Sequence, residues 1–356
     1  MALTLQHKWR RGLLLAVVLL LLLAGCSRQE GAPTVSTPSA IAQEATATPQ
    51  PTATTPPTAT VPTPTPAVTA TPPPSATPTV TPTATLTPTP DRVRFAVIGD
   101  YGLEGQPSAD VSAMVDSWQP DLILTTGDNN YPAGDPATID ANIGQYYADY
   151  IYPYLGSYPR EEGNEHNRFF PTLGNHDADT DGGQHYVDYF TLPGNERYYD
   201  FVWGPVHFFA VNSNWNEPDG ISATSTQAMW LQERLAASTA PWRVVYFHAA
   251  PYSSGWQGST AVMRWPFAEW GASVVFNGHE HVYEHLIVDG LHYFTIGASG
   301  YPALYSFVDI LPESQFRFNE DYGALRVEAT PAEMQVAFIT RDGTIVDRVT
   351  IANPDQ

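Results

Sequence analysis

Two stretches of the chain share one pattern: residues 93–102 read VRFAVIGDYG and residues 122–131 read LILTTGDNNY. In each stretch, a short run of β-branched and other apolar residues is followed by glycine and aspartate. Such a run predicts a buried strand, and the carboxyl ends of strands in open α/β sheets line the ligand crevice. We therefore expect Asp100 and Asp128 to lie at the functional edge of a sheet.

Three further apolar runs, at 169–173, 244–247 and 274–276, end in polar residues of similar chemistry. These residues carry oxygen or imidazole donors and are Asn175 and His176, His248, and His279 and His281. Glycine stands before several of them, which permits a sharp turn and a close approach of the backbone. One Gly-Asp pair after a strand is commonly only a turn, but five such strand ends in this order indicate a metal site.

The segments between these runs alternate between helical and strand periodicity. Helices are predicted around Val111 to Trp118, over 139–155 and over 226–237, and further strands over 198–203 and 206–211. The pairs Asp289-Gly290 and Asp342-Gly343 are typical of hairpin turns. We expect an α/β fold, a layered sandwich of mixed β-sheets flanked by helices, with parallel strands first and antiparallel hairpins toward the C-terminus.

Together the five strand ends resemble those of the calcineurin-like metallophosphoesterases, and most closely those of the purple acid phosphatases, over most of residues 93–297. The first motif of the wider superfamily is Asp-x-His, but Gly102 stands here in the place of that histidine. In the purple acid phosphatases a tyrosine three residues after the second aspartate substitutes for it, and Tyr131 occupies that position. The missing histidine at Gly102 and the tyrosine at position 131 are therefore consistent with each other. The resemblance implies the metallophosphoesterase fold and hydrolysis of phosphate esters.

The resemblance also implies a site for two metal ions, whose ligands are carried over residue by residue. Asp100, Tyr131 and His281 would hold one ion, Asn175, His248 and His279 the other, and Asp128 would bridge both. The anionic ligands of the first site suit Fe(III), and the largely neutral second site suits a divalent ion, which can be Fe, Zn or Mn.

His176, beside a ligand position, is expected to be a catalytic residue that contacts the substrate. Related enzymes carry a second active-site histidine shortly after His248, and this chain has none there. Protonation of the leaving group is therefore expected from His176 alone or from water.

Residues 1–26 are predicted to be a lipoprotein signal peptide. Lys8, Arg10 and Arg11 precede an apolar run at 13–23, which is shorter than the roughly 20 residues of a membrane span. The following sequence, LAGC, resembles a bacterial lipobox and implies that Cys26, the only cysteine, is lipidated; a plain secretory signal is the alternative. We expect an exported protein, lipid-anchored at the bacterial cell surface or the outer face of the membrane, with the anchor as its only membrane contact.

Residues 27–90 hold 16 prolines and 20 threonines, and such a segment cannot bury enough apolar surface to fold. We predict a disordered tether there and a metallophosphoesterase domain over 91–356. That domain has 12 arginines, no lysine and 35 acidic residues, which excludes a nucleic-acid scaffold because no basic face can form.

The expected function is hydrolysis of phosphate monoesters of small molecules by metal-bound hydroxide. Two alternatives stay open. One is a phosphodiesterase or nucleotidase on the same metal site, and the other is a tethered surface binding module with a degenerate phosphatase domain.

Overall fold

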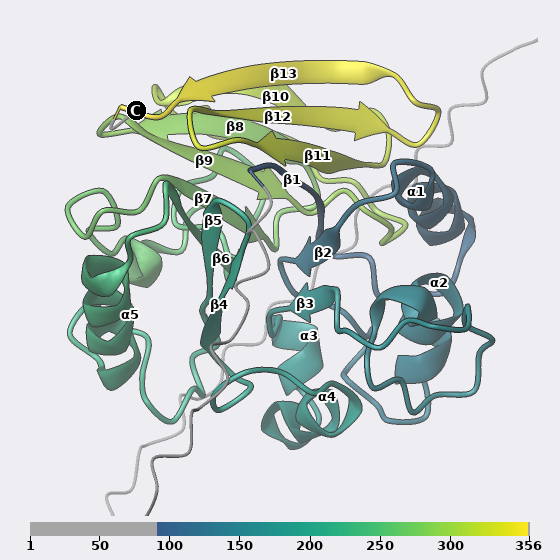
Figure 1. Cartoon of the computed structure of the whole chain (residues 1–356). Coiled ribbons are helices and arrows are strands. Elements are labelled where there is room, and N and C mark those ends of the chain that lie inside the picture. Colours follow the sequence, from purple (N-terminus) through teal and green to yellow (C-terminus); the bar gives the residue numbers. More distant parts are fainter. Residues whose placement is uncertain (1–90, 355–356) are drawn as a thin grey trace, which may run out of the picture. The chain divides into compact units, whose positions relative to one another are not determined.

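The computed structural model describes residues 91–354 of the chain. The predicted signal peptide with Cys26 and the predicted tether lie outside these residues. Two mixed β-sheets and the helices beside them make up the described part (Figure 1), which confirms the predicted fold class. None of the helices within 91–354 is long and apolar enough to cross a membrane.

The first sheet has six strands in the order β13-β12-β11-β1-β2-β3. Its parallel half comprises β1 (Val93–Ile98), β2 (Leu122–Thr125) and β3 (Phe169–Pro171). Its antiparallel half comprises β11 (Gly323–Ala329), β12 (Glu333–Thr340) and β13 (Ile345–Ala352). Strand β11 pairs with β1, so the C-terminal strands extend the sheet that the first strand begins.

The second sheet has seven strands in the order β10-β8-β9-β7-β6-β5-β4. Parallel strands form its centre: β5 (Val206–Ala210), β6 (Trp242–Ala249), β7 (Val274–Gly278) and β9 (Leu291–Ile296). Antiparallel strands flank them: β4 (Tyr199–Trp203), β8 (Tyr283–Val288) and β10 (Ser314–Phe318). The predicted hairpin turns join β8 to β9 and β12 to β13.

Aromatic side chains fill the space between the two sheets. Phe95 on β1 meets Phe208 on β5 edge-to-face, with ring centroids 5.1 Å apart, and Phe276 on β7 at 6.3 Å. Tyr283 on β8 stacks on Phe338 of β12 at 4.3 Å. All five side chains are buried, so aromatic contacts and the burial of apolar area hold the sheets face to face.

The longer helices follow their sequence signals. Helix α1 (Gln106–Ser117) buries Val111 and Val115. Helix α5 (Thr226–Ala237) is capped by Ser225, whose Oγ accepts a hydrogen bond from the backbone N–H of Ala228. The short helices are α3 (Asn175–Ala178), α4 (Gln184–Tyr189), η3 (Asp181–Gly183) and η4 (Ala261–Met263).

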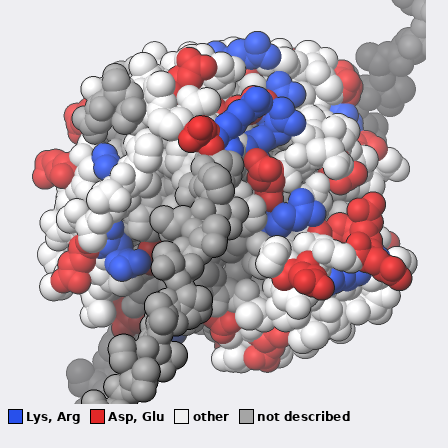
Figure 2. Space-filling model, in the orientation of Figure 1, with Lys and Arg blue, Asp and Glu red and all other residues white. Residues whose placement is uncertain are grey.

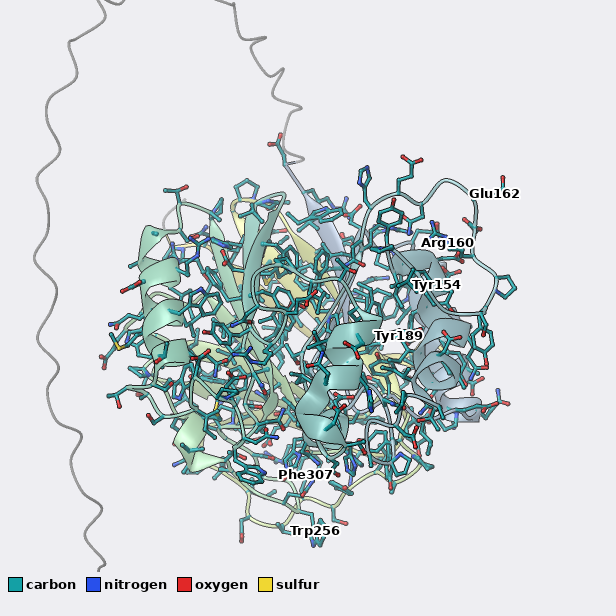
Figure 3. The ribbon with its side chains drawn as sticks, turned by 90° about the horizontal axis from the view of Figure 1, so that it is seen from below. Tyr154, Arg160, Glu162, Tyr189, Trp256 and Phe307 are labelled. Carbon is teal, nitrogen blue, oxygen red and sulfur yellow. The ribbon has the colours of Figure 1, made fainter. Side chains whose placement is uncertain are left out.

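The helix predicted over 139–155 is wrong in its extent. The segment forms a π-helical turn η1 (Asp140–Gly144), α2 (Gln145–Tyr147) and a 3₁₀ turn η2 (Ala148–Tyr150), and then leaves the helical path. Pro153 disfavours a helical conformation at the residue before it. Asp140 also holds the segment that follows, because its Oδ1 accepts hydrogen bonds from the hydroxyls of Tyr154 at 2.6 Å and Tyr189 at 2.8 Å. The rings of these two tyrosines lie side by side (Figure 3).

Acidic and basic side chains are interspersed on the face of the molecule shown in Figure 2. Several arginines are paired with acids, as Arg94 is with Glu328 at 3.1 Å and Arg341 with Asp321 at 2.8 Å. Much of the scarce positive charge of the domain is therefore already neutralised by acidic neighbours.

Candidate metal centre

The carboxyl ends of strands from both sheets meet at one place. Asp100 follows β1 and Asp128 follows β2, whereas His248 lies near the end of β6 and His279 follows β7. The backbone N–H of His279 donates to Oδ2 of Asp100 at 2.9 Å, and Nδ1 of His248 lies 2.8 Å from the carbonyl oxygen of Thr126. These two contacts join the second sheet to the first at the candidate site itself.

Three of the candidate residues have a left-handed backbone. The φ angles of Asp100, Asp128 and His279 are 53°, 52° and 70°, a conformation that costs a non-glycine residue roughly 1–3 kcal/mol. Gly127 also has a positive φ, and a Cβ atom there would lie 2.8 Å from both the backbone nitrogen of Gly174 and Nδ1 of His248. A side chain at position 127 would therefore clash with the loop after β3 and with His248.

A first group of donor atoms surrounds the hydroxyl of Tyr131. Its Oη lies 2.9 Å from Oδ2 of Asp128, 3.3 Å from Oδ1 of Asp100 and 3.3 Å from Nε2 of His281. Oδ1 of Asp100 and Nε2 of His281 are also 3.3 Å apart. All four side chains are buried. The four donor atoms therefore lie close together inside the protein.

A second group of donor atoms surrounds Nε2 of His248. It lies 3.0 Å from Oδ1 of Asn175, 3.2 Å from Nδ1 of His279 and 3.4 Å from Oδ2 of Asp128. Oδ2 of Asp128 thus belongs to both groups. The structure brings together all seven side chains that the sequence singled out as ligands.

Two histidine rings are oriented by backbone carbonyl groups. Nδ1 of His248 lies 2.8 Å from Thr126 O, and Nδ1 of His281 lies 2.9 Å from Ala303 O. A carbonyl oxygen only accepts, so Nδ1 carries the proton in both rings and Nε2 is left facing the carboxylates. This orientation through the outer ring nitrogen is typical of metal-binding histidines.

The electrostatics of the site call for added positive charge. Burial acts to raise the pKa of Asp100, but His248 and the hydrogen-bonded His281 outweigh it and the pKa is lowered. Burial acts to lower the pKa of His248, but Asp128 and Asp100 raise it. Within 91–354 the two aspartates pair with histidines and with no arginine. A histidine is charged only when protonated, so a bound cation would stabilise these buried carboxylates further.

The neutral donors complete the fit to a metal ion. Burial and the neighbouring His248 lower the pKa of His279 to about 4, so its ring offers a lone pair. Burial, Asp128 and Asp100 raise the pKa of the Tyr131 phenol well above its ordinary value, so the phenol ionises only beside a strong cation. Donor atoms of Asp100, Asp128 and His248 all lie within 4.8 Å of one another, and carboxylate, imidazole, amide and phenol donors together suit first-row metal ions.

His176 is beside the two groups and belongs to neither. Its backbone N–H donates to Oδ1 of Asp128 at 2.9 Å, and its Nδ1 lies 2.5 Å from Pro132 O. Its Nε2 is 4.0 Å from Oδ2 of Asp128, and the side chain is 35% exposed. The ring therefore faces both the donor groups and solvent, where a substrate can reach it.

Sequence reasoning assigned no role to Asp177, which directly follows Asn175 and His176 in the chain. Its buried carboxylate accepts hydrogen bonds from the backbone and side-chain N–H groups of Asn129, at 2.9 and 2.8 Å, and from the backbone N–H of Gly174 at 2.8 Å. Burial and the nearby Asp128 raise the pKa of Asp177 to about 6. Asp177 thus joins the loop after β2 to the loop after β3. Its position directly after Asn175 and His176 was the only feature of the sequence that pointed to a role.

Two tyrosines that sequence reasoning missed cover the first donor group. The ring of Tyr301 lies 4.4 Å from that of Tyr131, and Tyr305 stacks on His281 at 4.1 Å. Both belong to a loop after β9 that carries no recognisable motif, so only the structure connects them to the site.

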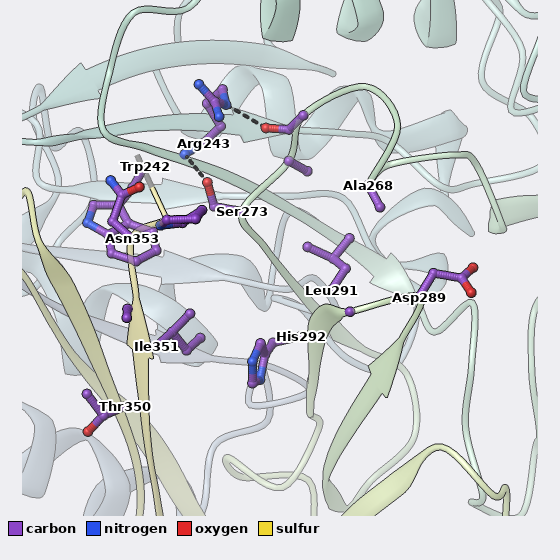
Figure 4. Close-up of a pocket in the computed structure, with 15 residues that line it drawn as sticks. Trp242, Arg243, Ala268, Ser273, Asp289, Leu291, His292, Thr350, Ile351 and Asn353 are labelled. Carbon is purple, nitrogen blue, oxygen red and sulfur yellow. Dashed lines mark hydrogen bonds between the residues drawn. The ribbon is translucent and has the colours of Figure 1, made fainter. Parts of the chain in front are cut away.

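A separate pocket lies at the other end of the second sheet. Its volume is about 470 Å³, and it is lined by Trp242 at the start of β6, by Arg243 and by His292 (Figure 4). Trp242 and His248 are six positions apart on the strand, which corresponds to roughly 20 Å. None of the predicted metal ligands within 91–354, nor His176, lines this pocket.

Comparisons with known proteins agree with this geometry. Residues 93–283 match the family model described as calcineurin-like phosphoesterase. Purple acid phosphatase 15 of Arabidopsis thaliana is 28% identical over 220 residues, which cover 54% of this chain and 40% of the plant protein. The chain therefore spans less than half the length of that relative.

Two solved structures share the fold. A purple acid phosphatase from yellow lupin (Lupinus luteus) seeds superposes with a TM-score of 0.61 and 18% identity, covering 73% of this chain and 54% of that one. The anchor protein in the inner membrane complex of Plasmodium superposes with a TM-score of 0.58 and 15% identity, covering 74% of this chain and 89% of that one.

Proposed function

This chain belongs to the calcineurin-like phosphoesterase family, and on that premise we propose that it is a binuclear metal phosphomonoesterase of the purple acid type. The observation that carries the proposal is the position of Oδ2 of Asp128 in both groups of donor atoms, 2.9 Å from Oη of Tyr131 and 3.4 Å from Nε2 of His248. A carboxylate oxygen that lies within reach of two sets of donors would allow Asp128 to serve as a ligand of two ions at once.

In this proposal each donor group holds one ion. Asp100, Tyr131 and His281 would hold Fe(III), Asn175, His248 and His279 would hold a divalent ion (Fe, Zn or Mn), and Asp128 would be a ligand of both. The two anionic ligands beside Asp128 in the first group support the higher charge there. Ions held by these residues would supply the positive charge that activates a water molecule as the nucleophile and stabilises the developing charge on the phosphoryl oxygens.

The side chains around the proposed ions have separate roles in proton transfer and in positioning. In the absence of a cation the Tyr131 hydroxyl is neutral and donates a hydrogen bond to Asp128. Tyr131 would have to release this proton to bind a metal ion through its oxygen. Nδ1–H of His176 is held by Pro132 O, so Nε2 is the atom that can give a proton to the leaving oxygen. Asp177 fixes the loops that carry Asp128 and Asn175.

The ester class is tested with matched substrates. Protein with two metal ions per chain is assayed on 4-nitrophenyl phosphate and on bis(4-nitrophenyl) phosphate, and we expect the higher kcat/KM for the monoester. A preference for the diester would establish the phosphodiesterase alternative. Turnover of neither ester by fully metal-loaded protein would favour a binding module, a possibility that the shared fold of the Plasmodium anchor protein keeps open.

We also propose that the protein is exported and lipid-anchored through Cys26, with residues 27–90 as a tether. The basic residues before an apolar run and the single cysteine at the end of a lipobox-like sequence support this proposal. The substrate would then be a phosphorylated small molecule outside the cytoplasm.

A further inference from the structure

Trp215 is an unusually exposed side chain next to the candidate metal centre. It is 87% exposed and lines a pocket of about 290 Å³ together with Asn175, Asp179, Asn214 and Asn216. Because Asn175 also belongs to the second donor group, the pocket opens directly beside the place where the phosphate ester would react.

The loop that carries Trp215 is held rigidly. Arg197 donates to both carboxylate oxygens of the buried Glu217, at 3.2 and 3.1 Å from its Nε, and Nδ2 of Asn212 donates to Oε2 of Glu217 at 2.6 Å. The backbone N–H of Glu217 donates to Asn214 O at 3.0 Å and closes a turn around Trp215. The indole is therefore presented to solvent by a fixed loop.

Two hydrogen-bond acceptors of this pocket, on Asp179 and Asn214, are accompanied by no positive charge. Among residues 91–354 no arginine lines the pocket, and Asp179 supplies a carboxylate. Nδ2 of Asn214 is engaged by Leu173 O at 3.3 Å and Asn212 Oδ1 at 2.8 Å, whereas its Oδ1 receives no hydrogen bond within 91–354. A ligand that fits these groups brings hydrogen-bond donors and no further negative charge.

We propose that this pocket binds the organic group of the substrate and that Trp215 determines specificity for a ring-bearing, uncharged alcohol such as a sugar or a nucleoside. This inference rests on the proposed phosphomonoesterase function. The ring packs on the indole face while its hydroxyl or amino groups donate to Asn214 and Asp179. Hydrolysis consumes one water and breaks the bond between phosphorus and the ester oxygen, and the ring alcohol leaves from this pocket.

The test compares ester classes on the full-length, metal-loaded protein. Wild type, Trp215→Ala and Trp215→Phe are assayed on glucose 6-phosphate, adenosine 5′-monophosphate and methyl phosphate. Leu155→Ala serves as the control, because Leu155 is 78% exposed and lines no part of this pocket. Unchanged Tm values show that the variants keep their fold.

We expect Trp215→Ala to lower kcat/KM for at least one ring ester by about 5- to 10-fold, mainly through KM, as loss of an aromatic contact predicts. Methyl phosphate should be unaffected, Trp215→Phe should retain most of the preference, and Leu155→Ala should behave as wild type. The ring ester that responds identifies the alcohol as a sugar or a nucleoside.

Equal losses on methyl phosphate and the ring esters would overturn the assignment, as would no loss on either ring ester. A wild-type protein inactive on all three esters would instead contradict the phosphomonoesterase proposal itself. The two failures are therefore distinguished by the wild-type rates alone.

Discussion

The hydroxyl of Tyr131 lies 2.9 Å from Oδ2 of Asp128, and the same carboxylate oxygen is 3.4 Å from Nε2 of His248. Tyr131 and Asp128 stand on one loop, three positions apart, whereas His248 comes from the other sheet. A hard phenol oxygen on one side of the carboxylate and an imidazole on the other give the two halves of the site different chemistry, which is the basis for proposing two different ions.

Asp128→Asn should reduce phosphatase turnover at least 100-fold. The substitution keeps the shape of the side chain but removes the negative charge that both ions would share. The other candidate ligands are fixed at separate strand ends and cannot move into its place. Turnover and metal content of the purified variant are the measurements, with Asp188→Asn, an exposed carboxylate bonded to Gln184 on α4, as the matched control. A variant that keeps two metal ions and a tenth of wild-type turnover would contradict a bridging role.

His176→Asn should slow hydrolysis of alkyl phosphates more than hydrolysis of 4-nitrophenyl phosphate. An alkoxide needs a proton when it leaves, whereas nitrophenolate is stable without one, so only the poor leaving group depends on a general acid. We expect a loss of about 100-fold for the alkyl ester, the lower end of the usual contribution of such groups. Equal losses on both esters would indicate that His176 positions phosphate instead, and no loss would remove it from the catalytic residues.

The buried strand ends were predictable because their signal is local. Strand β1 and helix α5 have the predicted bounds, and the candidate ligands follow their strands within a few residues. A donor directly after a buried strand is placed by the strand itself, so few distant contacts need to be known.

The features that sequence reasoning missed depend on distant contacts. The predicted helix after residue 139 stops early because Asp140 binds Tyr189, 49 positions away. The position of Trp215 depends on the pairing of Arg197 with Glu217 across 20 positions. Helical periodicity and motif spacing carry no information about such pairs, whose geometry is set only when the elements pack.

Stability should fall at acid pH in part because of Asp200 on β4. Burial acts to raise its pKa, but hydrogen bonds from His207 at 2.7 Å and Arg234 at 2.7 Å outweigh it, so the pKa lies below the unfolded value of 3.8. The folded state then binds fewer protons, and this stabilisation is present above about pH 4 and is lost as pH falls through the folded pKa.

Asp200→Asn should therefore lower Tm by a few degrees at pH 7, and the difference from wild type should shrink below pH 4. Thermal unfolding from pH 3 to pH 7 tests this, at equal metal content and with Asp188→Asn as control. A Tm difference that stays constant over this range would show that the ionised carboxylate contributes nothing.

Cys26→Ser should release the protein from the membrane fraction. No second cysteine can accept a lipid, and the acidic domain over 91–354 has no helix that could span a bilayer. Fractionation of cells producing wild type or variant, with metabolic labelling by a fatty acid, is the measurement. A variant that stays with the membranes as wild type does would contradict the lipid anchor.

The visible absorption spectrum of the iron-loaded, oxidised protein tests the proposed metal centre most directly. A phenolate bound to Fe(III) absorbs visible light by charge transfer from ligand to metal, so wild type should be coloured. Tyr131→Phe should lose the band and keep its Tm within a few degrees, because the buried ring remains and only the hydroxyl contacts with Asp128, Asp100 and His281 disappear. A colourless wild type that contains two iron ions per chain, or a Tyr131→Phe protein whose band is unchanged, would contradict the assignment of Tyr131 as a ligand and of Fe(III) to the first site.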